Sequence, residues 1–229
     1  MSKLTEKVVH QQVYQYLHGH GLLHPDHHGF LQSHSTATAL QQLVDIWLRT
    51  ADAGKLSATF LLDLRTGFDV INHKIFINKL KEYKFGETTL SWSCSYPMGR
   101  HECVQIEFSF SSFLSIPWGI PQGSIFGPLL FTIYVNELPV VVKEADMVED
   151  VTYEFDDDTE EDKQNKTSVA VFADDNSITT FHEDTEVLQQ KIEAKSKEVI
   201  DWFKINEITC IGKNEASHHG QKKTREKIE

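Results

Sequence analysis

The sequence has few cysteines, no secretory leader and no long uncharged apolar stretch. Its three cysteines, Cys94, Cys103 and Cys210, form no CxxC pair, which argues against a disulfide framework and against a cysteine-zinc cluster. No segment approaches the roughly 18 uncharged apolar residues that a membrane-spanning helix needs, and the N-terminal residues lack the apolar core of a signal peptide. These absences predict a soluble, intracellular protein that does not act in a membrane.

Basic residues are also scarce. The chain has 22 Lys and Arg against 34 Asp and Glu, a net charge of −12. Such a balance disfavours a polyanionic partner, because phosphate binding derives its affinity from Lys and Arg. However, residues 143–166 hold 11 acids against 3 Lys, which leaves a charge of only −4 on the other 205 residues. The acidity is therefore concentrated in one segment, which we expect to be a solvated, disordered insertion.

Helices and strands alternate along the chain, which predicts an α+β architecture in one globular unit. Hydrophobic spacing predicts two early amphipathic helices that face the core. Their apolar positions are Leu4, Val8, Val13 and Leu17 in the first, and Leu40, Leu43, Val44, Trp47 and Leu48 in the second, which begins at a Ser35 or Thr36 cap. Later elements are expected as a strand at 56–64, helices at 73–83 and 88–96, a strand pair at 103–116 turning at Ser111 and Ser112, a helix at 127–138, a hairpin of strands at 168–172 and 177–181, and a helix at 185–203.

Three aspartates stand out from this pattern. Asp63 comes at the end of the apolar strand, and Asp174 and Asp175 form a doublet at the tip of the hairpin. Neighbouring carboxylates repel each other unless a cation joins them, and oxygen ligands without His or Cys favour Mg²⁺ over zinc. Three such acids could hold two ions roughly 3.5–4 Å apart for an in-line displacement. The doublet taken alone is better explained as an ordinary turn, because Asp is common in turns.

Three segments, in this order, change that balance: LLDLRTGFDVINH at 61–73, GIPQGSIFGPLLFTIYVNELP at 119–139 and VAVFADDNSI at 169–178. They resemble successive palm motifs of non-LTR retrotransposon reverse transcriptases of the LINE and jockey type, and the similarity runs from about residue 2 to 210. The resemblance implies the fingers and palm of a right-hand polymerase, with an antiparallel palm sheet backed by helices. It also implies an RNA-directed DNA polymerase that acts on an RNA template, a DNA primer and deoxynucleoside triphosphates.

The resemblance divides the chain as follows: residues 1–142 form the fingers and first part of the palm, 143–168 an acidic insertion, 169–212 the catalytic hairpin and following helix, and 213–229 a polar tail. It implies that Asp63, Asp174 and Asp175 are catalytic and bind two Mg²⁺ ions, with Mn²⁺ as an alternative. No thumb or endonuclease segment is recognised, so autonomous retrotransposition is not expected.

A second set of residues is implied to contact the nucleotide. Phe68 matches the aromatic ring that in this family screens the sugar 2′ position, and Gln122 with Gly123 matches the PQG turn beside the incoming nucleotide and template. Arg65 could supply positive charge, since Thr66 stands where the family usually has Lys. Further along, Trp202 and Asn206 fall in the region that supports the primer end.

Other departures leave a second interpretation open. Leu31 and His34 occupy finger positions where the family usually has arginine, so two phosphate contacts are lost. Each lost contact could cost roughly 1.5–3 kcal/mol, or about ten- to a hundredfold in affinity. The alternative is therefore a catalytically inactive remnant of a mobile element that binds nucleic acid weakly.

Two further groups of side chains contain residue types that can bind metal ions. Histidines cluster near the N-terminus, and histidine is a common metal ligand. Their positions are His18, His20, His24, His27, His28 and His34, a spacing that fits no ordinary site, so structural roles are favoured. Asp156, Asp157 and Asp158 could bind Ca²⁺, but the segment lacks the alternating ligands and central glycine of an EF-hand loop. A solvated charge run explains these aspartates better.

Overall fold

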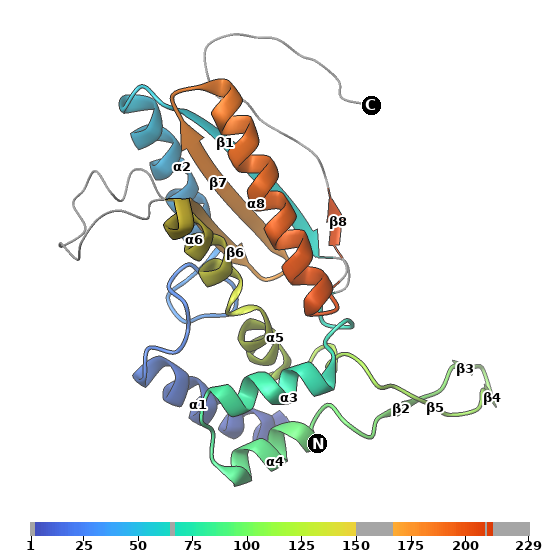
Figure 1. Ribbon diagram of the computed structural model, residues 1–229. Coiled ribbons are helices and arrows are strands. Elements are labelled where there is room, and N and C mark those ends of the chain that lie inside the picture. The colour runs from blue at the N-terminus through green and yellow to red at the C-terminus, as the bar shows by residue number, and fades with distance from the viewer. Residues whose placement is uncertain (1–2, 65–66, 150–166, 209, 213–229) are drawn as a thin grey trace.

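The computed structural model describes residues 3–64, 67–149, 167–208 and 210–212. Its elements are arranged in two adjoining parts, an upper part that contains the main sheet and a lower part that is mainly helical (Figure 1). In chain order they are α1 (Lys3–Gly19), α2 (Thr36–Asp52), β1 (Leu56–Leu64), α3 (His73–Glu82), α4 (Glu87–Ser95), β2 (His101–Glu102), β3 (Gln105–Ile106), β4 (Ser109–Phe110), β5 (Leu114–Ser115), α5 (Gly127–Val135), α6 (Leu138–Glu149), β6 (Ser168–Phe172), β7 (Asp175–His182), α8 (Thr185–Ile205) and β8 (Cys210–Gly212).

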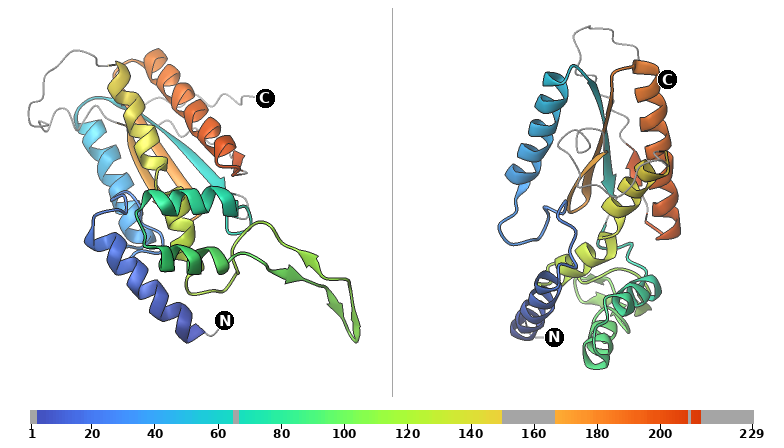
Figure 2. Two further views of the ribbon diagram at one scale, coloured as in Figure 1. Left: turned by 60° about the horizontal axis from the view of Figure 1, so that its bottom comes forward. Right: turned by 60° about the vertical axis from the view of Figure 1, so that its left-hand side comes forward.

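The upper part is a four-stranded antiparallel sheet in the order β6-β7-β1-β8. Helix α2 lies on one face of this sheet, and α8 with α6 lies on the other (Figure 2). The alternation of β1 produces the two faces, because successive side chains of a strand point in opposite directions. Leu62 and Leu64 enter the main core, whereas Thr59 accepts a hydrogen bond from Trp47 of α2. An antiparallel sheet backed by helices confirms the expected α+β class.

The lower part is built around α5. Eight of the nine residues of Gly127–Val135 are buried, and the ninth, Pro128, is half-buried, so this helix is enclosed on nearly every side. Figure 1 shows α1, α3 and α4 gathered around it. A helix with so many apolar residues requires this enclosure, because exposing it would leave a large apolar area in water. Phe76 of α3 and Leu17 of α1 are fully buried in the same core, which therefore continues from the sheet into the helices.

The two early helices form as expected, but they bury less than expected. Ser35 caps α2 through a capping box with Thr38. Leu4 of α1 is 73% exposed, and Leu40 and Leu48 of α2 are 57% and 60% exposed. The prediction that the whole apolar stripe of each helix faces the core is therefore wrong. The sheet contacts α2 at Gln42 and Trp47, whose side chains donate to the Val169 carbonyl and to Thr59, and the apolar stripe of the helix extends beyond these contacts.

The strand pair at 103–116 turns at a different place from the one predicted. Ile106 pairs with Ser109, so the tip is at Glu107 and Phe108, where Glu107 has a φ of 52°. The predicted Ser111 instead uses its hydroxyl to accept a hydrogen bond from the backbone of Val104 within the ladder. Residues 100–116 form an arm that extends away from the helices (Figure 1).

A second difference concerns the long helix expected at 127–138. The chain breaks after α5, and α6 then runs to Glu149, so residues 143–149 are helical where a loop was expected. The break occurs at Asn136, whose side chain accepts from the His24 amide and donates to the Leu22 carbonyl. Residues 150–166, including the aspartates considered for Ca²⁺, lie outside the described residues. Within the described residues, no helix is both long and apolar enough to cross a membrane.

Truncating Phe76 should destabilise the fold strongly, since its ring is 0% exposed within the core. We expect Phe76→Ala to lower the free energy of unfolding in urea by about 3–5 kcal/mol. The matched control is Phe108→Ala at the tip of the arm, where the ring is 97% exposed and the change should stay within about 0.5 kcal/mol. Similar losses for the two variants would contradict this core.

Candidate active site at the end of the central hairpin

The antiparallel ladder between β1 and β7 brings two of the predicted acids together. Asp63, the penultimate residue of β1, lies directly opposite Asp175, the first residue of β7. Directly opposed residues project to the same face of a sheet, with Cβ atoms roughly 4.5–5.5 Å apart. The third acid, Asp174, lies in the turn before β7, and its carbonyl accepts a hydrogen bond from the Leu64 amide at 2.9 Å. Both strand ends are thus fixed by backbone contacts.

The paired acids open onto one pocket. Asp63 and Asp175 line a cavity of about 300 Å³ beneath α2, together with Leu43 and Phe172. Asp174 and Asp175 are exposed, and Asp63 is half-buried. A cavity of this size, lined by apolar residues together with two aspartates, is large enough for part of a small polar ligand.

The acids present can accommodate a divalent cation. Among the described residues, no three Asp, Glu, His or Cys side chains converge into a complete metal cluster. Two carboxylates do share the pocket, and Mg²⁺ is commonly bound by one or two carboxylates together with substrate phosphates and water. Asp174 is next in sequence to one of them. The donor set of Asp63 and Asp175 therefore fits a hard cation that also binds phosphate.

The loop after β1 continues the site. A Cβ placed on Gly67 would lie 3.8 Å from the Cβ of Asp174 and 2.9 Å from the ring of Phe131. The next residue, Phe68, is half-buried, with its ring centroid 5.3 Å from that of Phe131 and 5.8 Å from that of Phe30. The predicted aromatic residue is thus held in place close to the acidic turn. Arg65 and Thr66 lie outside the described residues.

The predicted PQG turn lies against this same loop. Exposed Gln122 donates from Nε2 to both carboxylate oxygens of Asp69, each at 3.1 Å. Gly123 has a φ of 74° and open space around its Cα, so it is required for its backbone conformation rather than for close packing. Sequence reasoning missed Asp69. Its position beside Phe68 was a signal, but its partner was not apparent without the fold.

Trp202 and Asn206, considered for the primer end, are core residues. Their exposed fractions are 7% and 5%, and the Asn206 side chain donates to the Trp202 carbonyl. Lys79 lies over the Trp202 ring at 5.2 Å and forms an ion pair with Glu137 at 2.7 Å. Trp202 and Asn206 are therefore packed in the core, and the support of a primer end by this region stays a prediction.

A segment far away in sequence supports the hairpin of β6 and β7 from outside. The amide of His28 donates to the Val171 carbonyl at 2.7 Å, and the Val171 amide donates to the Asp26 carbonyl at 3.0 Å. Residues 26–28 thereby extend the sheet beyond its β6 edge. Gly29 then passes so close to the turn that a Cβ there would be 2.3 Å from the Ala173 nitrogen. Only glycine allows this approach of two backbones.

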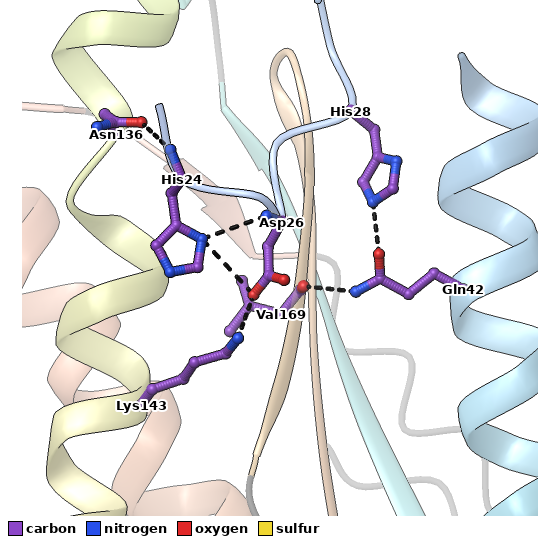
Figure 3. A network of polar contacts seen from close by, with 7 residues as sticks. All are labelled: His24, Asp26, His28, Gln42, Asn136, Lys143 and Val169. Carbon is purple, nitrogen blue, oxygen red and sulfur yellow. Dashed lines mark hydrogen bonds and ion pairs between the residues drawn. The ribbon is translucent and has the colours of Figure 1, made fainter. Parts of the chain in front are cut away.

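Polar side chains connect this segment to the helices on both sides (Figure 3). Toward α6, Asp26 forms an ion pair with Lys143 at 2.6 Å. Toward α2, the Nε2 of His28 donates to Gln42, whose amide donates in turn to the Val169 carbonyl. The side chains of His24 and His28 therefore have structural partners. Together these contacts connect the helical part to the strand that leads into the acidic turn.

His27 is the most deeply buried of these histidines. Its side chain is 2% exposed, and within the described residues its Nε2 atom has no hydrogen-bond partner. Burial disfavours the charged imidazolium and lowers the pKa of His27 to about 4. At neutral pH, His27 is therefore a neutral packing residue against Val171, with which its backbone forms a bridge.

Solved structures share this fold. A telomerase from Candida albicans, in a structure with a fragment of telomeric RNA, matches 97% of this chain and 35% of its own length, with a TM-score of 0.64 at 11% identity. A structure of apo telomerase from Candida tropicalis matches 98% of this chain and 42% of its own length, with a TM-score of 0.61 at 12% identity. The fold is therefore that of the fingers and palm of a right-hand polymerase.

Sequence comparisons narrow the class to a family. Residues 1–209 match the family model described as reverse transcriptase (RNA-dependent DNA polymerase), so the chain belongs to that family. It is 30% identical over 140 residues to the probable RNA-directed DNA polymerase from transposon BS of Drosophila melanogaster, and 26% identical over 199 residues to that from mobile element jockey of the same species. These matches cover 61% and 84% of this chain, but only 15% and 20% of the relatives. The resemblance to non-LTR retrotransposon reverse transcriptases is confirmed.

Adding a methyl group at Gly29 should disturb the acidic turn, because it would collide with the Ala173 backbone. We expect Gly29→Ala to lower the free energy of unfolding by about 1–3 kcal/mol. Gly19→Ala is the matched control, since a Cβ there meets nothing within 4 Å. Urea titrations followed by circular dichroism would compare the two, and an undisturbed Gly29→Ala variant would rule out the close approach.

Acid should destabilise the fold through His27. Its folded pKa of about 4 lies below the ordinary value of 6.5, so the unfolded chain binds the proton more tightly. Stability is then fully present above pH 6.5 and is lost as the pH falls toward 4, by an amount on the order of 3 kcal/mol. Unfolding titrations between pH 7 and 4 should show a shallower slope for His27→Leu than for the wild type. Exposed His20→Leu should keep the wild-type slope, and equal slopes for all three proteins would contradict the assignment.

Proposed function

We propose that this chain carries the polymerising core of an RNA-directed DNA polymerase, which adds deoxynucleotides to a DNA primer by two-metal nucleotidyl transfer. The observation that carries the proposal is the register of Asp63 opposite Asp175, with both residues lining one pocket. Because the chain belongs to the reverse transcriptase family, an ordinary turn is a poor explanation for these acids. The chain spans about a fifth or less of the curated relatives, so the activity of a longer protein is part of the same proposal.

In this mechanism, Asp63 and Asp175 would hold the divalent ions, and Asp174 in the adjoining turn would complete the set of carboxylates. Bound Mg²⁺, or Mn²⁺ in its place, would activate the primer 3′-hydroxyl and stabilise the leaving pyrophosphate. The protein's own contribution is to position the acids. Backbone bonds hold both strand ends before any ligand arrives, so little reorganisation is needed when metal and phosphate bind.

The nucleotide would bind beside the acids. Phe68 is packed between two other aromatic rings, which suits a rigid wall against the sugar 2′ position. Gln122 and Gly123 on the facing turn would border the base pair formed with the template. Arg65 directly precedes this loop in sequence and is proposed as a source of positive charge for the phosphates. This placement supports deoxynucleoside triphosphates as substrates, with RNA as the template.

The proposed division of the chain follows from this site. Residues 1–142 would supply the fingers and first part of the palm, and 169–212 would supply the catalytic hairpin and following helix. Contacts of residues 24–28 with α2, α6 and β6 support treating these parts as one functional unit. The acidic insertion at 143–168 begins within α6, and the polar tail at 213–229 is assigned no role.

A second candidate is a chain that binds nucleic acid weakly and catalyses nothing. The observation that favours it is the loss of positive charge from the finger segment. Leu31 packs against the core, and the exposed His34 ring makes an edge contact with His28. Neither side chain has a guanidinium group, with which arginine donates paired hydrogen bonds to a phosphate. The two candidates differ in whether the acids support chemistry.

Neutralising the acids decides between these candidates. Primer extension on an RNA template, with Mg²⁺ or Mn²⁺, should fall at least about a hundredfold in Asp63→Asn and Asp175→Asn, because amides bind the metal poorly. Asp174→Asn should also lose activity. The matched control is Asp52→Asn, an exposed acid at the end of α2, which should retain full extension.

Wild-type extension no greater than that of Asp63→Asn would remove the enzyme hypothesis. Fluorescence anisotropy with a labelled RNA template annealed to a DNA primer would then test the second candidate. Weak, salt-sensitive binding would support a non-catalytic nucleic-acid-binding module.

A further inference from the structure

An exposed amide and an exposed carboxylate meet beside the proposed nucleotide site. Gln122 follows Pro121 in the PQG turn, and Asp69 follows Phe68 in the loop after β1. The Gln122 Nε2 atom lies 3.1 Å from both oxygens of Asp69. Surface side chains of this kind usually point into water, so a contact across 53 residues of sequence requires an explanation.

The backbone explains why these two side chains meet. The Gly119 amide donates to the Ile71 carbonyl, and the Ile120 amide donates to the Phe68 carbonyl, both at 2.8 Å. A Cβ on Gly119 would lie 2.9 Å from the Asp69 Cα. The two loops are therefore joined as one rigid piece. The backbone contacts between the loops, and not the side-chain rotamers alone, therefore bring Asp69 and Gln122 together.

The chemistry of this pair determines which way the amide points. An ionised carboxylate only accepts hydrogen bonds, whereas a glutamine amide has a donor end and an acceptor end. Gln122 must therefore turn its NH₂ group toward Asp69, which directs its Oε1 atom away from Asp69. A charge-assisted hydrogen bond favours this orientation over the flipped one by roughly tenfold. With a neutral partner in place of Asp69, both orientations would be available.

We propose that Asp69 is a positioning residue that fixes the amide polarity of Gln122. In this role, Gln122 offers an acceptor oxygen to the substrates, and it recognises an O–H or N–H donor rather than a phosphate oxygen. Such donors are present on the sugar of an incoming nucleotide and on the edges of bases. This inference rests on the proposed polymerase function, and it assigns to Asp69 a role that differs from metal binding by Asp63, Asp174 and Asp175.

Steady-state kinetics of the full chain test the role. Asp69→Asn is nearly isosteric, but it can accept or donate and so lets Gln122 flip. We expect the KM for the nucleotide to rise about twofold with kcat unchanged, because the fraction of Gln122 in the competent orientation falls from roughly nine-tenths to about a half. Asp69→Glu keeps the carboxylate and should recover part of the loss. A KM in Asp69→Asn equal to the wild-type value would overturn the proposal.

A double variant that exchanges the donor and the acceptor between positions 69 and 122 tests the polarity of the pair directly. In the double variant Asp69→Asn with Gln122→Glu, the new amide donates and the new carboxylate accepts, so an acceptor again faces outward. This variant should have a lower KM than Asp69→Asn alone. An additive loss from the two substitutions would contradict the polarity argument. Comparing nucleotides with and without the 3′-hydroxyl assigns the donor, because only recognition of the sugar makes the effect of Asp69→Asn depend on that hydroxyl.

A measurement without catalysis separates this inference from the proposed function. In ¹⁵N-labelled protein, the Gln122 side-chain amide signal is identified by its disappearance in Gln122→Ala. It should differ in shift from the signal of an exposed glutamine and move toward that value in Asp69→Asn. Such a movement supports the pairing even in a chain that extends no primer, where the polymerase proposal alone would have failed. An unmoved signal in Asp69→Asn would overturn the pairing.

Discussion

The antiparallel register between β1 and β7 determines where every other part of the site can be. It runs from Leu56 opposite His182 to Asp63 opposite Asp175, so the acids come together only if every residue pair along the ladder keeps this register. A slip of one residue would turn each side chain of β1 to the other face. Leu64 would then leave the core in which it is 1% exposed. Burial of the apolar face therefore fixes the acids indirectly, since the same register serves both.

A second constraint prevents the hairpin from acting as a free edge. Strand β6 is the outer strand of the sheet, and an unpaired edge could fray or bind other strands. Residues 26–28 cover that edge with backbone hydrogen bonds, and Asp26 and His28 attach the covering segment to α6 and α2. The acidic turn is consequently supported from the helical part of the molecule, although it lies at the end of a short hairpin.

The sequence allowed the local elements of the site to be predicted, but not the contacts among them. The strand at 56–64 matches β1 and the hairpin at 168–181 matches β6 and β7, because both depend on alternation and turn chemistry near in sequence. The break at Asn136 could not be predicted, since it depends on hydrogen bonds to residues more than a hundred positions earlier. The role of Asp69 was hidden for the same reason. Its partner, Gln122, is close only in the folded chain.

Charge connects the site to the composition of the chain. Asp63, Asp69, Asp174 and Asp175 all lie at or beside the pocket and its adjoining loops, and the finger positions of Leu31 and His34 add no fixed positive charge. A phosphate approaching these acids alone would be repelled, because like charges in a partly enclosed site interact strongly. Under the proposed mechanism, metal binding must therefore precede or accompany phosphate binding. By linkage, a bound triphosphate must strengthen metal binding to the same extent. The acidity that argues against a nucleic-acid partner thus becomes compatible with one, because the cations supply the attraction that basic side chains supply elsewhere.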